Sequence, residues 1–280
     1  MISLKAMRSV RPSTLAIHAA LLVGAIVMVG PYIWMLLTSF KTATEVVKVP
    51  PTILPDHFQW GNYGDVLSLL SFKYLYWNTA FMTVGRTLGQ LLFCSLAAYA
   101  FARIRFPGHN VLFVLFLSVL MVPFQVFIIP QYIIMQHLGW IDTMKALIVP
   151  GMFSAFGTFL LRQFFMSLPR ELEEAARLDG ANHFQIYWRI MLPLAKPGLI
   201  AVAILTILWS WNDFLWPLVV INSGGKLPIA PGLALLQGQH STEYQILMAG
   251  AVLATWPTVL VFVLLQRHFV EGIALTGTKG

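Results

Sequence analysis

The chain has 280 residues, of which 58% are hydrophobic and only 10% are charged, and its mean hydropathy is +0.75. Soluble proteins are about a quarter charged, so this composition excludes an ordinary soluble domain. The net charge of +7 does not indicate a nucleic-acid-binding protein, because the basic residues do not gather with aromatic residues on one face. The single cysteine, Cys94, excludes an intrachain disulfide and a metal site built on thiolates.

Six apolar runs are long enough to cross a bilayer as helices, which takes about 20 residues each. They cover residues 14–38, 77–101, 110–134, 145–166, 198–221 and 243–265. The first run follows a basic stretch, as in a signal peptide, but it is too long for one and no small-residue cleavage site follows Leu37. We therefore expect it to be retained, and the sequence predicts an all-α, multi-pass membrane protein with six transmembrane helices.

Lysine and arginine are distributed unevenly over the segments that flank these runs. If the N-terminus is inside, the inner segments hold twelve of them: Lys5, Arg8, Arg11, Arg103, Arg105, Arg162, Arg170, Arg177, Arg189, Lys196, Arg267 and Lys279. The outer segments then hold five: Lys41, Lys48, Lys73, Lys145 and Lys226. Basic residues favour the cytoplasmic side of a membrane. We therefore expect both termini, and the segment between the fourth and fifth runs, to be cytoplasmic in a protein of the cell membrane.

The segment 39–74, on the outer side in this orientation, is rich in proline and aromatic residues (VPPTILPDHFQWGNY). Pro50, Pro51 and Pro55 deny it a long helix, so we expect extended and turn structure that forms a cap on the outer face. No linker separates two soluble domains. The prediction is one permease domain over residues 1–280.

The loop 167–197, between the fourth and fifth runs, is unlike its surroundings because charged residues crowd into Glu171–Asp179. The pattern predicts a helix with Glu173 and Arg177 paired at i,i+4, ended by Gly180. A second helix follows, with Asn182 as its cap and Gln185 placed to complete a capping box. Its positions Phe184, Tyr187, Trp188 and Met191 form an aromatic stripe that must pack either on the inner ends of the spans or on another protein.

The same loop resembles the signature of binding-protein-dependent ABC importer permeases, which reads EAA, three residues, Gly, nine residues, I-x-L-P. Here it is Glu174-Ala175-Ala176, then Gly180, then Ile190-Met191-Leu192-Pro193. The resemblance implies that the first short helix docks into a cleft of a separate ATPase subunit. It assigns ATPase coupling to Glu174, Ala175, Ala176, Asp179, Gly180, Ile190, Leu192 and Pro193. We expect Leu172–Gly180 to meet the ATPase and Phe184–Met191 to rest on the chain's own bundle.

The rest of the chain is similar to the carbohydrate-uptake branch of that family, in the segments 95–108, 121–143, 209–220 and 266–280. This resemblance implies a sugar or sugar-like solute and alternating access. It also implies three kinds of partner: a second, different permease, two ATPase subunits and an extracytoplasmic solute-binding protein. The tail GIALTGTKG (272–280) lacks a Walker A motif, so we expect no ATPase activity and no cofactor in this chain, with ATP and Mg bound by the partner. That tail either reaches toward the ATPase or is a frayed terminus.

Asp213 lies within the fifth run, where a charge costs about 2.5–3.5 kcal/mol to insert. One interpretation is a water-filled translocation path, in which Trp211, Asn212 and Asp213 contact the solute. The other is a structural ion pair with Arg86 of the second run. An ion-gradient-driven secondary transporter that uses Asp213 and Arg86 is the alternative at the level of the whole protein.

Gln125 lies in the third run beside Pro123, with Pro130 further along. The prolines free backbone carbonyls and bend the helix, so Gln125 either lines the path or stabilises the kink. Small residues in the second run, Gly85, Gly89, Ala97 and Ala98, are more typical of close helix packing than of a binding site.

Overall fold

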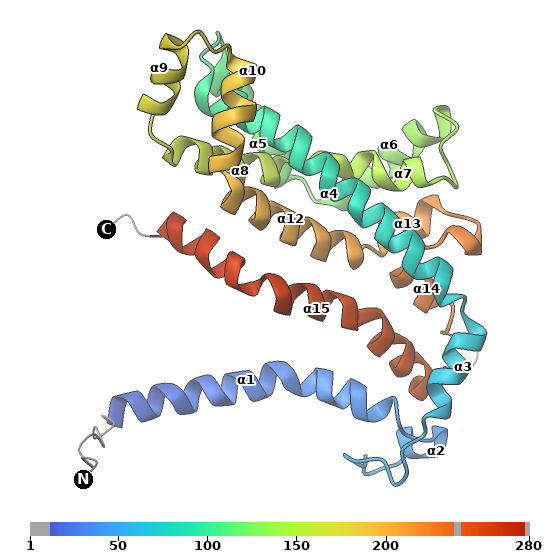
Figure 1. Ribbon diagram of the computed structural model, residues 1–280. Helices are drawn as coiled ribbons and strands as arrows, with labels where there is room; N and C mark the ends of the chain where they lie inside the picture. Colours follow the sequence, from blue (N-terminus) through green and yellow to red (C-terminus); the bar gives the residue numbers. More distant parts are fainter. Residues whose placement is uncertain (1–11, 238–241, 278–280) are drawn as a thin grey trace, which may run out of the picture. The chain divides into compact units, whose positions relative to one another are not determined.

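The computed structural model describes residues 12–237 and 242–277 (Figure 1). The chain is helical within these ranges, where the one β pairing is an isolated bridge between Gln237 and Thr242. The all-α prediction is confirmed. Internal contacts divide the chain into two compact units, residues 1–69 with 236–253 and residues 70–235 with 254–280. The assignment of residues 1–280 to one permease domain stays a prediction.

Four described helices are long and apolar enough to cross a membrane: Ala16–Thr38, Phe72–Arg103, Met144–Ser167 and Tyr244–Leu264. Two bent helix pairs, His109–Met121 with Phe124–His137 and His183–Leu194 with Lys196–Trp211, bring the number to six if each pair is one span. The six predicted runs therefore correspond to these elements, although the third and fifth are sharply bent and the fourth, Met144–Ser167, is interrupted at Phe153.

The first unit holds α1 (Pro12–Thr38), α2 (Ala43–Val46), α3 (Gly61–Leu69) and the beginning of α15 (Tyr244–Gly277). Between α1 and α3 the chain forms turns and one four-residue helix, as the prolines predict. Phe40 packs against Trp60 with ring centroids 4.7 Å apart, and Asn62 donates to the carbonyl oxygens of Ser39 and Lys41. These contacts fold residues 39–63 into one compact segment.

The second unit is built around α4 (Phe72–Arg103), which packs against α8 (Ala155–Ser167) and α12 (Lys196–Trp211) (Figure 1). Its other helical elements are α5 (His109–Ser118), η1 (Val119–Met121), α6 (Phe124–His137), α7 (Met144–Ile148), η2 (Pro150–Met152), α9 (Glu171–Leu178), α10 (His183–Ile186), a π-helical turn (Tyr187–Met191), α11 (Leu192–Leu194), α13 (Leu215–Val220), η4 (Gly224–Lys226), α14 (Ile229–Ala234) and the part of α15 that starts at Ala254.

Glycines let α4 approach the segment formed by α7 and η2. A Cβ atom at Gly85 would lie 2.8 Å from the side chain of Ile148, and one at Gly89 would lie 2.4 Å from that of Met152. Ala98 is fully buried on the same helix. The prediction that small residues of the second run serve close packing is confirmed at Gly85, Gly89 and Ala98.

The third run bends by 101° between η1 and α6. Val122 is extended, as expected for a residue before proline, and Pro123 occupies the N-cap of α6. Pro130 remains inside α6. The predicted bend is therefore present, and Pro123 is the residue that causes it.

The fifth run is also broken, and its prediction as one helix over 198–221 is wrong. α12 ends at Trp211, residues 212–214 leave helical geometry, and α13 starts at Leu215. A helix continued through Pro217 would need an N–H that proline lacks and would bring its ring against the carbonyl of Asp213, four residues earlier. At its other end, α12 meets the 183–194 segment at an angle of 75°.

Candidate functional site

The EAA-type loop forms the two helices that the sequence predicts. α9 starts with three glutamates in its first turn, which suits the positive end of the helix dipole. It ends at Gly180, whose φ of +82° places it in the left-handed region, while Ala181 N–H donates to Ala176 and Gly180 N–H to Arg177. Asn182 then caps α10 in a reciprocal capping box with Gln185, with both bonds at 2.9 Å.

An ion pair that the sequence did not reveal fastens α9 to the end of α4. Arg103 Nε lies 3.2 Å from Glu173 Oε1, and the two side chains are only 4% and 7% exposed. The predicted partner of Glu173, Arg177, lies farther away at 3.8 Å and is half exposed. Arg103 also donates to the carbonyl oxygens of Phe165 and Leu168, so one guanidinium joins α4, α8 and α9. No periodicity relates residues 103 and 173, and the pair follows only from the fold.

The aromatic stripe of the loop divides between two environments. Tyr187 and Met191 are buried, and the Tyr187 hydroxyl forms a 2.8 Å hydrogen bond with Ser95 of α4. Phe184 and Trp188 are 67% and 55% exposed and stack on each other. The expectation that all of Phe184–Met191 rests on the chain's own bundle is therefore wrong for these two residues, because the bundle covers only one side of so narrow a helix.

The residues assigned to ATPase coupling are mostly accessible. Glu174, Ala175, Asp179, Gly180 and Pro193 are exposed. Ile190 and Leu192 are half-buried, and Ala176 packs into the core beside Tyr99 and Phe165. Leu178, at the tip of α9, is 89% exposed. We call Leu172, Leu178, Phe184 and Trp188 the loop apolar surface. They are the exposed large apolar side chains of residues 167–188.

Arg86 and Asp213 form the ion pair that was one of the two interpretations of Asp213. Arg86 Nη1 lies 2.8 Å from Asp213 Oδ2, and the side chains are 9% and 21% exposed. Arg86 Nε also donates to the Leu147 carbonyl oxygen at 2.7 Å, which ties α4 to α7. Asp213 lies in the break between α12 and α13, so the pair holds the broken fifth run against α4.

Gln90, one turn further along α4, extends the polar contacts. Its amide donates to the Gly151 carbonyl oxygen, and its side-chain oxygen accepts from Thr206 of α12 at 2.8 Å. Every one of these groups is supplied by α4, α12 or the segment between α7 and α8. This arrangement stabilises the packing of the bundle, as expected for polar groups inside a membrane protein.

The other candidate path residues are not gathered around Asp213. Trp211 is half-buried and donates to the Ala254 carbonyl oxygen, and Asn212 bonds back to Leu208 within its own helix. Gln125 is exposed on α6 and its side chain makes no hydrogen bond within the described part of the chain. The structure therefore brings Arg86 and Asp213 together, but not Gln125 with them.

Comparison with known proteins identifies the family of this helical bundle. A family model described as "Binding-protein-dependent transport system inner membrane component" matches residues 90–274. The chain belongs to this family. It is 37% identical to the arabinooligosaccharides transport system permease protein AraQ of Halalkalibacterium halodurans, over 91% of this chain and 93% of that one. It is 35% identical to the sn-glycerol-3-phosphate transport system permease protein UgpE of Brucella suis biovar 1, over 94% and 97%.

A solved structure agrees with this assignment. The chain superposes with a TM-score of 0.81, at 26% identity, on a chain of a bacterial ABC transporter involved in the import of the acidic polysaccharide alginate, over 94% of this chain and 99% of that one. The resemblance inferred from the EAA-type loop is confirmed, and the protein is a membrane-spanning permease subunit of an ABC importer. Family membership argues against the alternative of an ion-gradient-driven transporter.

Proposed function

We propose that the protein carries a sugar or sugar-like solute across the cell membrane by alternating access, driven by ATP hydrolysis in partner subunits. The choice of solute is supported by the names of the relatives, which are transporters of arabinooligosaccharides and of sn-glycerol-3-phosphate. In this proposal the chain works with a second, different permease, two ATPase subunits and an extracytoplasmic solute-binding protein. ATP and Mg are bound by the ATPase, and this chain needs no cofactor of its own.

The observation that carries the coupling proposal is the loop apolar surface. Full burial of a large apolar side chain contributes about 1.5–3 kcal/mol, so four such side chains left in water forgo a substantial stabilisation. α9 is outside every candidate span, so lipid tails do not cover Leu172 and Leu178, whereas Phe184 and Trp188 lie in the bent pair that begins at His183. We propose that the partner ATPase covers this surface, with Glu174, Ala175, Asp179 and Gly180 at the contact.

The proposed orientation puts this loop and both termini in the cytoplasm. It is supported by the basic residues in the loop and just before it, Arg162, Arg170, Arg177, Arg189 and Lys196. The segment 39–74 would then face outward, where a binding protein could dock. Of the tail 272–280, which the sequence suggested could reach the ATPase, residues 272–277 continue α15 and residues 278–280 lie outside the described residues.

The translocation path is proposed more narrowly than from the sequence alone. Trp211 and Asn212 flank the break in the fifth run, where backbone leaves helical geometry, and broken helices in membranes are tolerated where they are covered by protein or line a cavity. Arg86 and Asp213 would act first as the structural tie across this break. Gln125 lies just after the bend of the third run and would line the path only if that bend turns α6 toward it.

Substitution of Gly180 tests the coupling proposal. A valine there would be forced into a left-handed conformation that β-branched residues avoid, whereas asparagine tolerates it. No heavy atom lies within 4 Å of the site where a Cβ would sit, so both side chains start from open space and the backbone conformation is the main difference between them. We expect Gly180→Val to reduce solute uptake at least tenfold with the protein still in the membrane, and Gly180→Asn to retain most of it. Undiminished uptake in Gly180→Val would refute the docking role of the turn.

A further inference from the structure

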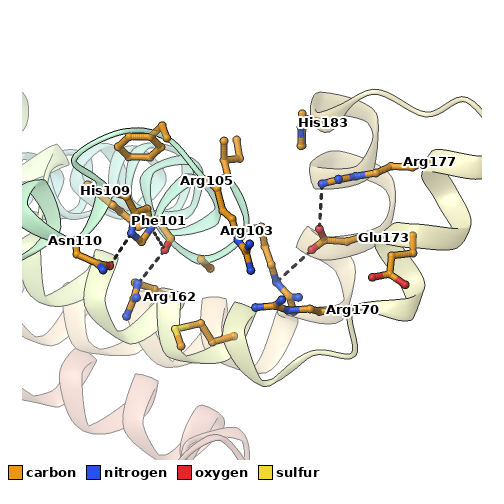
Figure 2. A pocket seen from close by; sticks show the side chains of 15 residues that line it. Phe101, Arg103, Arg105, His109, Asn110, Arg162, Arg170, Glu173, Arg177 and His183 are labelled. Carbon is orange, nitrogen blue, oxygen red and sulfur yellow. Dashed lines mark hydrogen bonds and ion pairs between the residues drawn. The ribbon is translucent and has the colours of Figure 1, made fainter.

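A cavity of about 780 Å³ lies beside the loop, between the turn after α4, the end of α8 and α9. Figure 2 shows its lining, which is strongly basic. The described residues that line it include five arginines (Arg103, Arg105, Arg162, Arg170 and Arg177) against two glutamates (Glu173 and Glu174). This charge is unusual in a chain with so few charged residues, and neither the loop apolar surface nor the Arg86–Asp213 pair involves it.

The arginines differ in how far their charge is already compensated. Arg103 is paired with the buried Glu173 and forms the wall of the cavity rather than a free site. Arg162 donates to the carbonyl oxygen of Phe101 and lies over the ring of Phe113, both of which are neutral. Arg105 and Arg170 are exposed and make no side-chain hydrogen bond or ion pair within the described part of the chain. Three guanidinium groups therefore face the cavity without an acidic partner.

The cavity lies at the level where two candidate spans end. The spans Phe72–Arg103 and Met144–Ser167 stop at its edge, and Met166 and Arg170 line it from the end of the second. The cavity therefore lies on the side of the bilayer where both spans end, and basic pockets between transmembrane helices on the cytoplasmic side bind the headgroups of acidic lipids. Arginine suits this task because its planar fork donates two hydrogen bonds to one phosphate.

Most of the surface proposed for the ATPase faces another way, and Glu174 is the one residue that belongs to both. Helical spacing places Arg170, Glu173 and Arg177 on one side of α9, whereas Leu172 and Ala175 lie on the opposite side. The cavity is concave and lined by residues of α4, α5, α8, α9 and α10, which fits an anionic group held from several sides. A docked protein would instead need the convex tip at Leu178.

We propose that this cavity, which we call the arginine cavity after Arg105, Arg162 and Arg170, binds a phosphate-bearing anion. The same chemistry can come from the headgroup of an acidic phospholipid or from free phosphate. A bound phosphate would bridge the turn after α4 to the beginning of α9 and so hold the coupling helix at a fixed angle to the bundle. Because the site lies next to α9, its occupancy would change how strongly a movement of the ATPase is coupled to the membrane spans.

The test uses the assembled transporter with its partner subunits, in nanodiscs of phosphatidylcholine with and without phosphatidylglycerol. Lipids retained by the complex are counted by native mass spectrometry, and inorganic phosphate is added as a competitor. The variant is Arg105→Gln with Arg170→Gln, which breaks no side-chain hydrogen bond among the described residues. Arg189→Gln is the matched control, because Arg189 is an exposed arginine of the same loop outside the cavity. The variant Arg105→Lys with Arg170→Lys keeps both charges but lacks the planar fork of arginine, so it separates the effect of charge from that of two-donor geometry.

We expect the wild type and Arg189→Gln to retain phosphatidylglycerol in preference to phosphatidylcholine, and the double glutamine variant to retain at least about tenfold less. A second outcome is that the wild type binds phosphate and does not prefer phosphatidylglycerol, while the double glutamine variant has lost phosphate binding. The anion is then free phosphate, and the proposal stands. If the variant binds both probes as the wild type does, the proposal is wrong. It is equally wrong if the variant loses only the co-purifying ATPase, because the cavity would then be a protein interface.

Discussion

Arg86 and Asp213 show how a charge can be accommodated inside a bundle of membrane helices. Each would be costly alone in an apolar environment, and each is offset by the other at 2.8 Å. Because Arg86 also holds the Leu147 carbonyl oxygen, loss of Asp213 leaves the guanidinium only partly compensated. The pair therefore has a structural role whether or not the solute passes near it.

Arg86→Met should destabilise the purified protein by about 3–5 kcal/mol, because it leaves Asp213 charged and unpaired. The double variant Arg86→Met/Asp213→Leu should recover most of this stability, since it leaves no isolated charge. Thermal unfolding in detergent measures the stability, and uptake measured in parallel assigns the role. Recovery of both assigns the pair a structural role alone, and recovery of stability without uptake adds a role in the transport path. A double variant as unstable as Arg86→Met would contradict the structural tie.

Glu45 stabilises the segment 39–74 through hydrogen bonds to its ionised form. Its carboxylate accepts hydrogen bonds from the backbone amides of Thr42 and Asp56, both at 2.7 Å. These bonds lower the pKa of Glu45 from 4.5 to about 2, and the bond from Thr42 has the larger effect. An acidic group whose pKa is lowered by folding stabilises the folded state at every pH above the pKa that the group has in the unfolded chain. This contribution is lost as the pH falls from about 4.5 toward 2.

Hydrogen-exchange protection of the Thr42 and Asp56 amides, corrected for intrinsic rates, should therefore fall across that pH range. In Glu45→Gln the protection should be low already at neutral pH and should change little on acidification. Protection in the wild type that is unchanged down to pH 2 would contradict the role of this carboxylate.

At the scale of elements, close packing of α4 against η2 depends on the absence of a side chain at Gly89. A Cβ atom there would lie 2.4 Å from Met152. Gly89→Ala should lower the stability of the bundle by about 1–3 kcal/mol, as overpacking does. Met152→Ala in the same chain should restore part of it by making room. Gly30→Ala in α1, where no heavy atom lies within 4 Å of the added Cβ, is the control and should be neutral by thermal unfolding.

The elements differ in how far the sequence predicts them. Helix ends in the loop are local properties, so Gly180 and the Asn182–Gln185 capping box were predicted from spacing alone. The break of the fifth run was missed, although Pro217 was visible, because hydropathy alone does not distinguish a straight span from a broken one. The Arg103–Glu173 pair depends on how α4, α8 and α9 meet, and only the fold supplies that information.

At the scale of the whole molecule, the central claim is that the chain is the membrane component of an importer powered by a separate ATPase. The family and the fold are shown by the comparisons, and the loop apolar surface indicates where the ATPase would act. A pull-down of the detergent-solubilised chain should bring an ATPase subunit with it, and less of it when Leu178 is replaced by aspartate. A homodimer recovered alone would contradict the proposed assembly.

The most direct measurement is solute uptake into proteoliposomes that contain the complete transporter, with its binding protein outside. We predict that uptake requires ATP and Mg in the lumen, where the ATPase subunits of right-side-out complexes lie, and is unaffected by an ionophore that collapses ion gradients. Uptake that continues without ATP and stops with the ionophore would contradict the account.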